Sequence, residues 1–112
     1  MKAVFCHSND DQELHTRVIN NIRNLLDDDS VDVDSVALVD NSGGIRLFTH
    51  GSPHTEQGEV LLERGVSIKQ CRNTLAGTDI TEADLVGGVE LVVSGIGELT
   101  RLRAEGCAYL KP

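Results

Sequence analysis

Short apolar runs recur along the chain and are separated by longer stretches with a mixed apolar and polar pattern. Each run is four or five residues long and contains aliphatic residues, as is typical of short strands buried within a sheet. The runs cover residues 2–6, 36–39, 66–70, 89–93 and 107–110. We therefore predict five short strands.

The stretches between these runs carry apolar residues at helical spacing. Residues 12–26 show it most clearly, because one stripe of the predicted helix is apolar and its other faces are polar. Ser8 or Asn9 is expected to cap this helix at its start. The apolar stripe consists of Leu14, Val18, Ile22, Leu25 and Leu26. Further helices are predicted over residues 45–48, 55–64, 72–76 and 95–105, and a brief helical turn over residues 78–85.

Strand and helix alternate through the whole sequence. This order predicts an α/β fold of three layers, in which helices cover both faces of a mainly parallel five-stranded sheet through right-handed crossovers. No linker, repeat or low-complexity segment interrupts the alternation, and 112 residues suit one compact core. We therefore expect a single domain over residues 1–112.

The net charge argues against several classes of partner. The chain has 18 acidic and 10 basic residues, which leave a formal net charge of −8. A field of this sign repels phosphate groups, so nucleic acids and anionic membrane surfaces are not expected as partners. The excess of Asp over Glu and of Arg over Lys leaves open whether the source is halophilic or the protein is simply acidic.

Cysteine usage and hydropathy favour an intracellular protein. Three cysteines, an odd number, do not make the disulfide framework of a small secreted domain. No signal peptide precedes the first predicted strand, and no apolar run approaches the ~18 residues that a membrane span needs. We expect a cytoplasmic protein with reduced thiols.

Three polar segments lack the pattern of a metal or nucleotide site. The acidic run 27–34 has neither the glycine nor the closing glutamate of a calcium loop. The glycine pair after the second strand lacks the spacing of a dinucleotide fingerprint or a P-loop. His50 and His54 are separated by a glycine and a proline, so they do not form a helical metal pair and are expected in a surface loop. No metal and no cofactor are expected.

The carboxyl ends of the predicted strands define a candidate site. In a parallel sheet these ends meet at one edge, where α/β proteins place their ligands and their chemistry. Four predicted strand ends carry polar or thiol side chains: Cys6-His7, Asp40-Asn41, Cys71-Arg72 and Val93-Ser94. Cys107 instead stands at the start of its strand, so we expect it at the opposite edge.

Cys71 is the strongest candidate for chemistry at this edge. It ends a strand just before a predicted helix, and a helix N-terminus together with Lys69 and Arg72 would favour its thiolate. A buried thiol acting as a small apolar side chain is the alternative, and the spacing alone leaves both open. We expect Cys6 to be a core residue rather than a resolving partner, and His7 to carry protons for Cys71 if the first and third strands approach. No Cys-His-Asn hydrolase signature is present.

Nearly the whole chain resembles the small DsrE/DsrF-like proteins, which are related to TusD-type sulfur-relay subunits and YchN-like proteins. It is most similar to the stand-alone archaeal and bacterial members. The resemblance is carried by the opening strand Lys2–Cys6, the turn Asn41–Gly44, the run Gly65–Cys71 with the following Asn73–Leu75, and the closing runs Val93–Leu99 and Arg101–Pro112.

The resemblance implies a three-layer α/β/α fold and assembly into homotrimers or homohexamers. In the sulfur-relay members a cysteine at the position of Cys71 carries a persulfide, so the resemblance implies a sulfur carrier or sulfurtransferase with donor and acceptor proteins as partners. The chain departs from those members after this cysteine, where Arg72–Gly77 replaces an alanine-rich segment with arginine and glycine.

The implied mechanism is thiolate attack by Cys71 on a donor persulfide. We expect Asn41, Asn73 and Ser94 to stabilise the anionic sulfur, and Arg72 to supply charge. Cys71 should then lie in a partly open pocket near a subunit boundary. The alternative function is a non-enzymatic oligomeric module that binds a small molecule, with Cys71 only lining the pocket.

Overall fold

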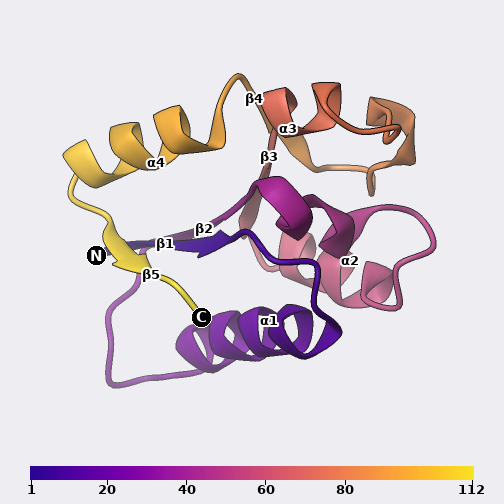
Figure 1. The fold of residues 1–112 in the computed structure, drawn as a ribbon. Coiled ribbons are helices and arrows are strands. Elements are labelled where there is room, and N and C mark those ends of the chain that lie inside the picture. Colours follow the sequence, from indigo (N-terminus) through magenta and orange to yellow (C-terminus); the bar gives the residue numbers. More distant parts are fainter.

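A sheet of five parallel strands forms the middle layer of the computed structural model, which describes residues 1–112 (Figure 1). The strands lie in the order β4-β3-β2-β1-β5. Their bounds are β1 Lys2–His7, β2 Ser35–Asp40, β3 Ser67–Cys71, β4 Glu90–Val92 and β5 Ala108–Leu110. The helices are α1 Gln12–Leu26, α2 Thr55–Glu63, α3 Arg72–Ala76 and α4 Gly95–Ala104, with the 3₁₀ helices η1 Ser42–Phe48 and η2 Glu82–Asp84.

The α/β fold predicted from the sequence is confirmed. All five strands are present within two residues of the expected bounds, and every pairing in the sheet is parallel. The three central strands are buried on both faces, which explains their nearly continuous apolar sequences. The edge strands β4 and β5 are short and more exposed.

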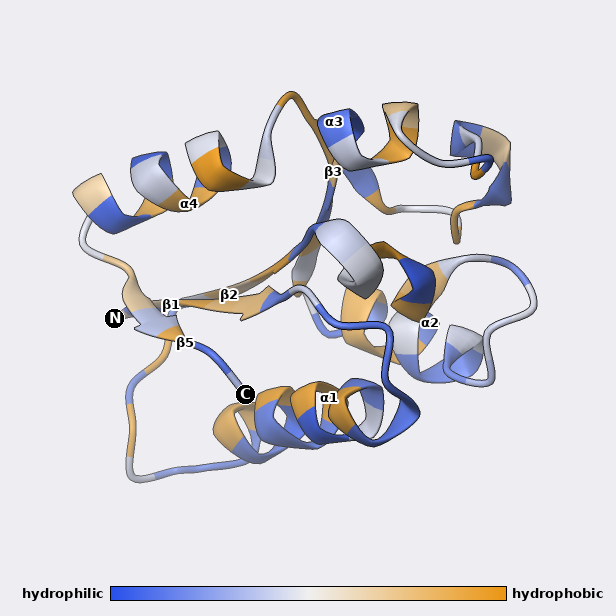
Figure 2. Ribbon diagram, viewed as in Figure 1, coloured by the Kyte–Doolittle hydropathy of each residue, from blue (hydrophilic) through white to orange (hydrophobic).

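Helices cover both faces of the sheet (Figure 1). On one face α1, α2 and η1 pack over side chains such as Phe5, Leu38 and Ile68. On the other face α4 packs over the alternate residues, among them Val4 and Val39. Side chains of a strand point alternately to the two faces, so each strand contributes to both cores. Figure 2 shows the apolar sheet between helices whose outer surfaces are hydrophilic.

The N-cap residue of α1 differs from the prediction. Asp11 is the N-cap residue, in place of Ser8 or Asn9, and its carboxylate accepts hydrogen bonds from the N–H groups of Glu13 and Leu14 at 2.9 and 3.1 Å. A carboxylate at this position also complements the positive end of the helix dipole. The helix itself covers Gln12–Leu26, as predicted.

None of the helices combines the length and the apolar character that a membrane span requires.

A candidate thiol site at the carboxyl edge of the sheet

Cys71 lies where one strand and two helices meet. It is the last residue of β3 and the N-cap residue of α3, and 6% of its surface is exposed. Lys69, two residues earlier on the same face of β3, contacts Glu98 of α4. Because alternate residues of a strand share a face, the Cys71 side chain also lies on the α4 face of the sheet.

One interaction caps α4 at its start, and another holds its first turns against this part of β3. The Ser94 hydroxyl accepts a hydrogen bond from the N–H of Gly97 at 3.1 Å and so caps the helix, as its sequence position predicts. Glu98 is 9% exposed and forms ion pairs with Lys69 below it and with Arg101 one turn later. The N-terminus of α4 is thereby fixed beside Cys71.

The surroundings of the sulfur lower its pKa. Burial alone would raise the pKa of Cys71, but the Thr74 hydroxyl and the N–H groups of Gly95, Thr74 and Asn73 outweigh it and bring the pKa below its ordinary value. Hydrogen-bond donors and helix N-termini favour the thiolate over the thiol. The Cys71 side chain makes no cap hydrogen bond of standard geometry to α3. The lowered pKa of Cys71 is the combined effect of these donors.

The two flanking cations do not have the role that the sequence suggested. Neither Lys69 nor Arg72 is among the groups that shift the pKa of Cys71. The Lys69 ammonium is paired with Glu98, which cancels most of its field at the sulfur. Arg72 is exposed on the first turn of α3, where water screens its charge. The expectation that these charges favour the thiolate is therefore wrong.

The turn after β2 contacts both helix starts beside Cys71. A Cβ placed on Gly95 would lie 3.0 Å from the Cβ and 3.1 Å from the Nδ2 of Asn41, so the two residues are in close contact. The next residue, Ser42, donates its N–H to the Thr74 hydroxyl oxygen at 3.0 Å. The structure therefore brings Asn41, Asn73 and Ser94 to the neighbourhood of Cys71. Thr74 and Gly95 were not identified from the sequence.

His7 does not belong to this site. Strand β2 lies between β1 and β3, so the condition for a proton carrier, an approach of the first and third strands, is not met. The His7 ring also lies on the α1 face, where its Nε2 is 2.6 Å from the Nδ1 of His15. The sheet therefore separates His7 from the Cys71 sulfur.

A cluster of three buried histidines lies on that other face. His7, His15 and His54 are 4%, 0% and 9% exposed, and the His15 ring centroid is 4.8 Å from that of His7 and 5.8 Å from that of His54. Burial, with smaller contributions from His15 and Lys111, lowers the pKa of His7 to about 4. The side chains are not arranged to hold a metal ion.

The expectation that His54 lies in a surface loop is wrong. Its Nε2 is 3.1 Å from the Oε1 of Gln12, and this contact with α1 draws the loop inward. His15 could have been assigned to the core from its sequence position. It precedes Val18 and Ile22 at helical spacing and so falls on the buried stripe of α1.

The other two cysteines lie mainly among apolar side chains, although the Lys111 ammonium donates a hydrogen bond to the Cys6 sulfur at 3.9 Å. Cys6 and Cys107 are 5% and 7% exposed and belong to the core beneath α4. Cys107 precedes β5 and so lies at the edge of the sheet opposite the strand ends, as predicted. No disulfide links the three thiols. The expectation that Cys6 is a core residue is confirmed.

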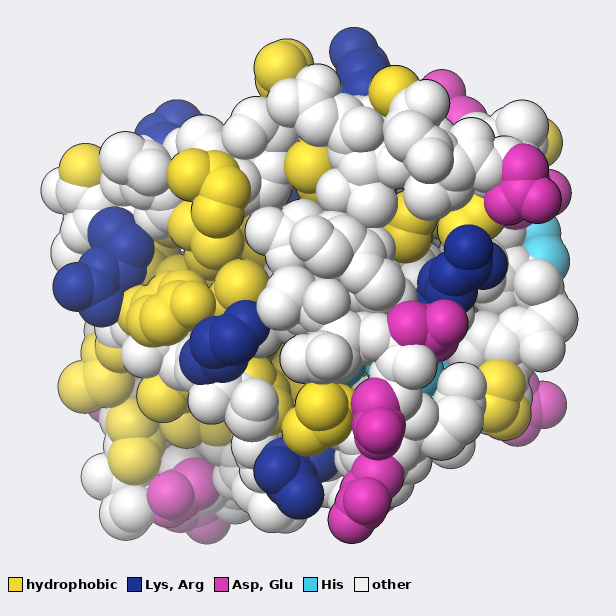
Figure 3. Space-filling view, in the orientation of Figure 1, with side chains coloured by type: hydrophobic (Ala, Val, Ile, Leu, Met, Phe, Trp, Pro, Cys, Tyr) yellow, Lys and Arg dark blue, Asp and Glu magenta, His cyan; other side chains and the backbone are white.

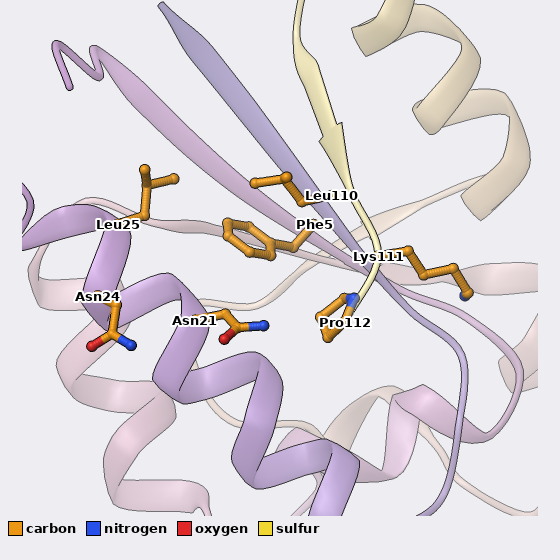
Figure 4. A pocket seen from close by; sticks show the side chains of 7 residues that line it. All are labelled: Phe5, Asn21, Asn24, Leu25, Leu110, Lys111 and Pro112. Carbon is orange, nitrogen blue, oxygen red and sulfur yellow. The ribbon is translucent and has the colours of Figure 1, made fainter.

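The expected open pocket at Cys71 is not found in the single chain. None of five surface pockets, with volumes of about 150 to 460 Å³, is lined by Cys71. One of them, of about 260 Å³, lies between α1 and the C-terminal segment near the β5 edge (Figure 4). It is lined by Phe5, Asn21, Asn24, Leu25, Leu110, Lys111 and Pro112. Cys71 is instead covered by the polar residues described above, and its neighbours Arg72, Asn73, Val93 and Ile96 are exposed.

Solved structures similar to this chain have the same fold. A protein of unknown function from Methanobacterium thermoautotrophicum, MTH1491, is 32% identical over 99% of this chain and 98% of its own, with a TM-score of 0.92. The conserved protein of unknown function BT1422 from Bacteroides thetaiotaomicron is 14% identical over 99% and 94%, with a TM-score of 0.73. The ychN protein from E. coli is 16% identical over the whole of both chains, with a TM-score of 0.71.

A scan against protein-family profiles and a search of curated proteins found no match. The likenesses to BT1422 and YchN concern the fold, since their sequence identities are low. The identity to the Methanobacterium protein extends over nearly the whole of both chains. The chain therefore belongs to the same family as the Methanobacterium protein, and it has the DsrE/DsrF-like fold that it shares with YchN.

Proposed function

We propose that the protein carries sulfane sulfur as a persulfide on Cys71 and passes it on in an intracellular sulfur relay. One observation carries this proposal: the Cys71 sulfur stands at the end of β3 among the Thr74 hydroxyl and N–H groups of α3 and α4, which lower its pKa. A thiolate is the form of cysteine that attacks sulfur. Cys6 and Cys107 lie in the core beneath α4, and the polar neighbours of the Cys6 sulfur are the side chains of Lys111 and Tyr109 rather than N–H groups at a helix start.

The loading step begins with attack by the Cys71 thiolate on the outer sulfur of a donor persulfide. The new S–S bond forms to Cys71 as the donor's S–S bond breaks, and the donor leaves as a thiolate. The sulfane sulfur changes carrier without net oxidation or reduction. The N–H groups of Asn73 and Gly95 are placed to stabilise the negative charge that the terminal sulfur then carries.

The unloading step reverses these roles. An acceptor thiolate attacks the terminal sulfur, and Cys71 leaves as a thiolate. A thiol with a low pKa is a good leaving group, so the donors that favour loading also favour release. Ser94 supports both steps by capping α4, and Asn41 by its contact with Gly95. Arg72 is exposed and offers a positive charge to an anionic donor or acceptor.

We include self-association, as a homotrimer or homohexamer, in the proposal. Figure 3 shows hydrophobic side chains gathered beside α4 and β5, with Lys and Arg side chains around them. Ile96 is 66% exposed there, Tyr109 38% and Leu110 39%. Ile96 and Tyr109 line a hollow of about 460 Å³ between α4 and β5, and Leu110 lines the pocket of about 260 Å³ beside α1. Apolar side chains exposed together on an edge strand favour contact with a further copy or with a relay partner.

The alternative of a small-molecule-binding module has no specific support. It requires a pocket lined by Cys71, and none of the five surface pockets has that lining. The sulfur carrier is therefore the function that the geometry supports best.

The test is sulfur loading resolved by residue. The protein is incubated with polysulfide, the excess is removed, persulfides are trapped by alkylation, and the peptides of the three cysteines are weighed by mass spectrometry. One added sulfur is expected on Cys71. It should be absent from Cys71→Ser and retained in Cys6→Ser and Cys107→Ser. Equal loading of all three cysteines, or none on Cys71, would contradict the proposal.

A further inference from the structure

Ser42 has an unusual backbone conformation beside the thiol site. Its φ angle is 48°, and it is the only residue other than glycine with a positive φ. The left-handed region is unfavourable for a serine, so its surroundings must hold it there. In this conformation the N–H of Ser42 points at Thr74, to which it donates a hydrogen bond of 3.0 Å.

The two glycines that follow Ser42 fix the turn against the end of β1. A Cβ on Gly44 would lie 2.1 Å from the carbonyl oxygen of His7, and one on Gly43 would lie 2.7 Å from the backbone nitrogen of Asp10. The N–H of Asn41 also donates to the His7 carbonyl at 3.0 Å. The turn is therefore locked between the segment after β1 and the start of α3.

The hydrogen bond from Ser42 determines how the Thr74 hydroxyl can be used. A hydroxyl has one hydrogen to donate, and its oxygen accepts in other directions. Since the Thr74 oxygen already accepts from Ser42, its hydrogen points away from that N–H. Cys71 lies three residues before Thr74, across the first turn of α3, and the Thr74 hydroxyl is the first of the groups that lower the pKa of its thiol.

We propose that the turn Asn41–Gly44 orients the hydroxyl of Thr74 toward the Cys71 sulfur, and that Thr74 thereby acts as a catalytic hydrogen-bond donor to the reacting thiolate. This inference rests on the proposed function in one respect, that Cys71 is the reacting group. The hydroxyl stabilises the thiolate before it attacks the donor persulfide and again when Cys71 leaves. A hydrogen bond to an ionised sulfur is stronger than one to the neutral thiol. It therefore stabilises the Cys71 thiolate both as the attacking group and as the leaving group.

The experiment is alkylation by iodoacetamide over a range of pH, with each cysteine followed in its own peptide by mass spectrometry. In Thr74→Val and Thr74→Ala we expect alkylation of Cys71 near pH 6 to slow on the order of tenfold, and its pH profile to move to higher pH. Thr74→Ser keeps the hydroxyl and should restore the wild-type profile. Cys6 and Cys107 serve as internal controls whose rates should not change.

Thr16→Val is the matched control for the loss of a threonine hydroxyl. Thr16 is exposed on α1, which covers the other face of the sheet, so the profile of Cys71 should stay that of the wild type. Thermal unfolding checks that each variant is folded. If Thr74→Val does not fold, Thr74→Ala provides the test. An unchanged Cys71 profile in a folded Thr74→Val or Thr74→Ala would overturn the inference, as would a Thr74→Ser that behaves like Thr74→Val. The outcome does not depend on whether wild-type Cys71 accepts sulfur, so it is separable from the loading test.

Discussion

Cys71 differs from the other two cysteines in what surrounds its sulfur rather than in how deeply it is buried. All three are less than a tenth exposed. Cys6 and Cys107 pack among aliphatic side chains, with the Lys111 ammonium reaching the Cys6 sulfur at 3.9 Å, whereas Cys71 faces a hydroxyl and three backbone N–H groups. Burial without donors raises the pKa of a thiol, and donors lower it. Exposure alone would therefore have failed to identify the reactive cysteine.

The buried His7 makes the stability of the fold depend on pH. Its pKa is lowered to about 4, so between that value and the unfolded pKa of about 6.5 the unfolded chain binds the extra proton. The stability is fully present above pH 6.5 and is lost as the pH falls toward 4. We expect the free energy of unfolding to fall by about 2 kcal/mol from pH 7 to pH 5 through this group.

Urea unfolding at the two pH values measures this loss. Burial also lowers the pKa of the neighbouring His54, which adds a loss in the same direction. His7→Gln replaces the ring with a neutral amide and should reduce the difference between the two pH values. If the free energy of unfolding falls as much between pH 7 and pH 5 in His7→Gln as in the wild type, the pH dependence comes from other groups.

At the level of the elements, the placement of α4 decides what Cys71 can do. The Glu98–Lys69 ion pair is largely buried and joins α4 to β3 close to the thiol. Glu98→Gln leaves the Lys69 ammonium without its counter-charge, so we expect a loss of about 1–3 kcal/mol in the free energy of unfolding. Because α4 carries the Gly95 N–H, the pKa of Cys71 should also rise.

Glu105→Gln is the control for this variant. Glu105 is also paired with Arg101, but both side chains are about half exposed, and such surface pairs contribute little. Its unfolding free energy, measured by urea denaturation, should stay within about 0.5 kcal/mol of the wild type. Equal losses in the two variants would show that the buried pair does not hold α4 in place.

The elements themselves could be predicted because each is defined by a local pattern. The helical spacing of Val18 and Ile22 and the apolar runs of the central strands lead directly to α1 and to the sheet. The site could be predicted only as far as the parallel topology brings strand ends together, which applies to Cys71 and Asn41. Thr74 depends on a hydrogen bond from Ser42, 32 residues earlier in the chain, and no local pattern indicates it. The inward turn of His54 toward Gln12 has the same long-range origin.

On the scale of the whole molecule, charge and apolar surface are unevenly distributed. The chain carries a net charge of −8, yet Arg103 and Lys111 lie beside the exposed apolar side chains of α4 and β5 (Figure 3). This basic and apolar edge is complementary to the acidic remainder of another copy. Contact through it would also bury the open edge of β5.

Tyr109→Asp tests whether this edge is used for self-association. The added carboxylate would be buried in the contact, so we expect the assembly to dissociate to monomers in light scattering coupled to size exclusion. Val60→Asp is the control, because Val60 is also exposed, at 48%, but lies on α2 on the other face. An assembly that survives Tyr109→Asp would place the interface elsewhere, and a monomeric wild type would remove self-association from the proposal.

The transfer of a labelled sulfur atom tests the central claim most directly. The protein is loaded with polysulfide enriched in a heavy sulfur isotope, freed of excess reagent and then mixed with glutathione as the acceptor thiol. Mass spectrometry should find the label first on Cys71 and then on glutathione as a persulfide, with Cys71 returned to the thiol. Cys71→Ser should neither take up the label nor pass it on. If the label is taken up equally by Cys71→Ser, or if it stays on Cys71 when the acceptor is added, the protein is not a sulfur carrier of the kind proposed.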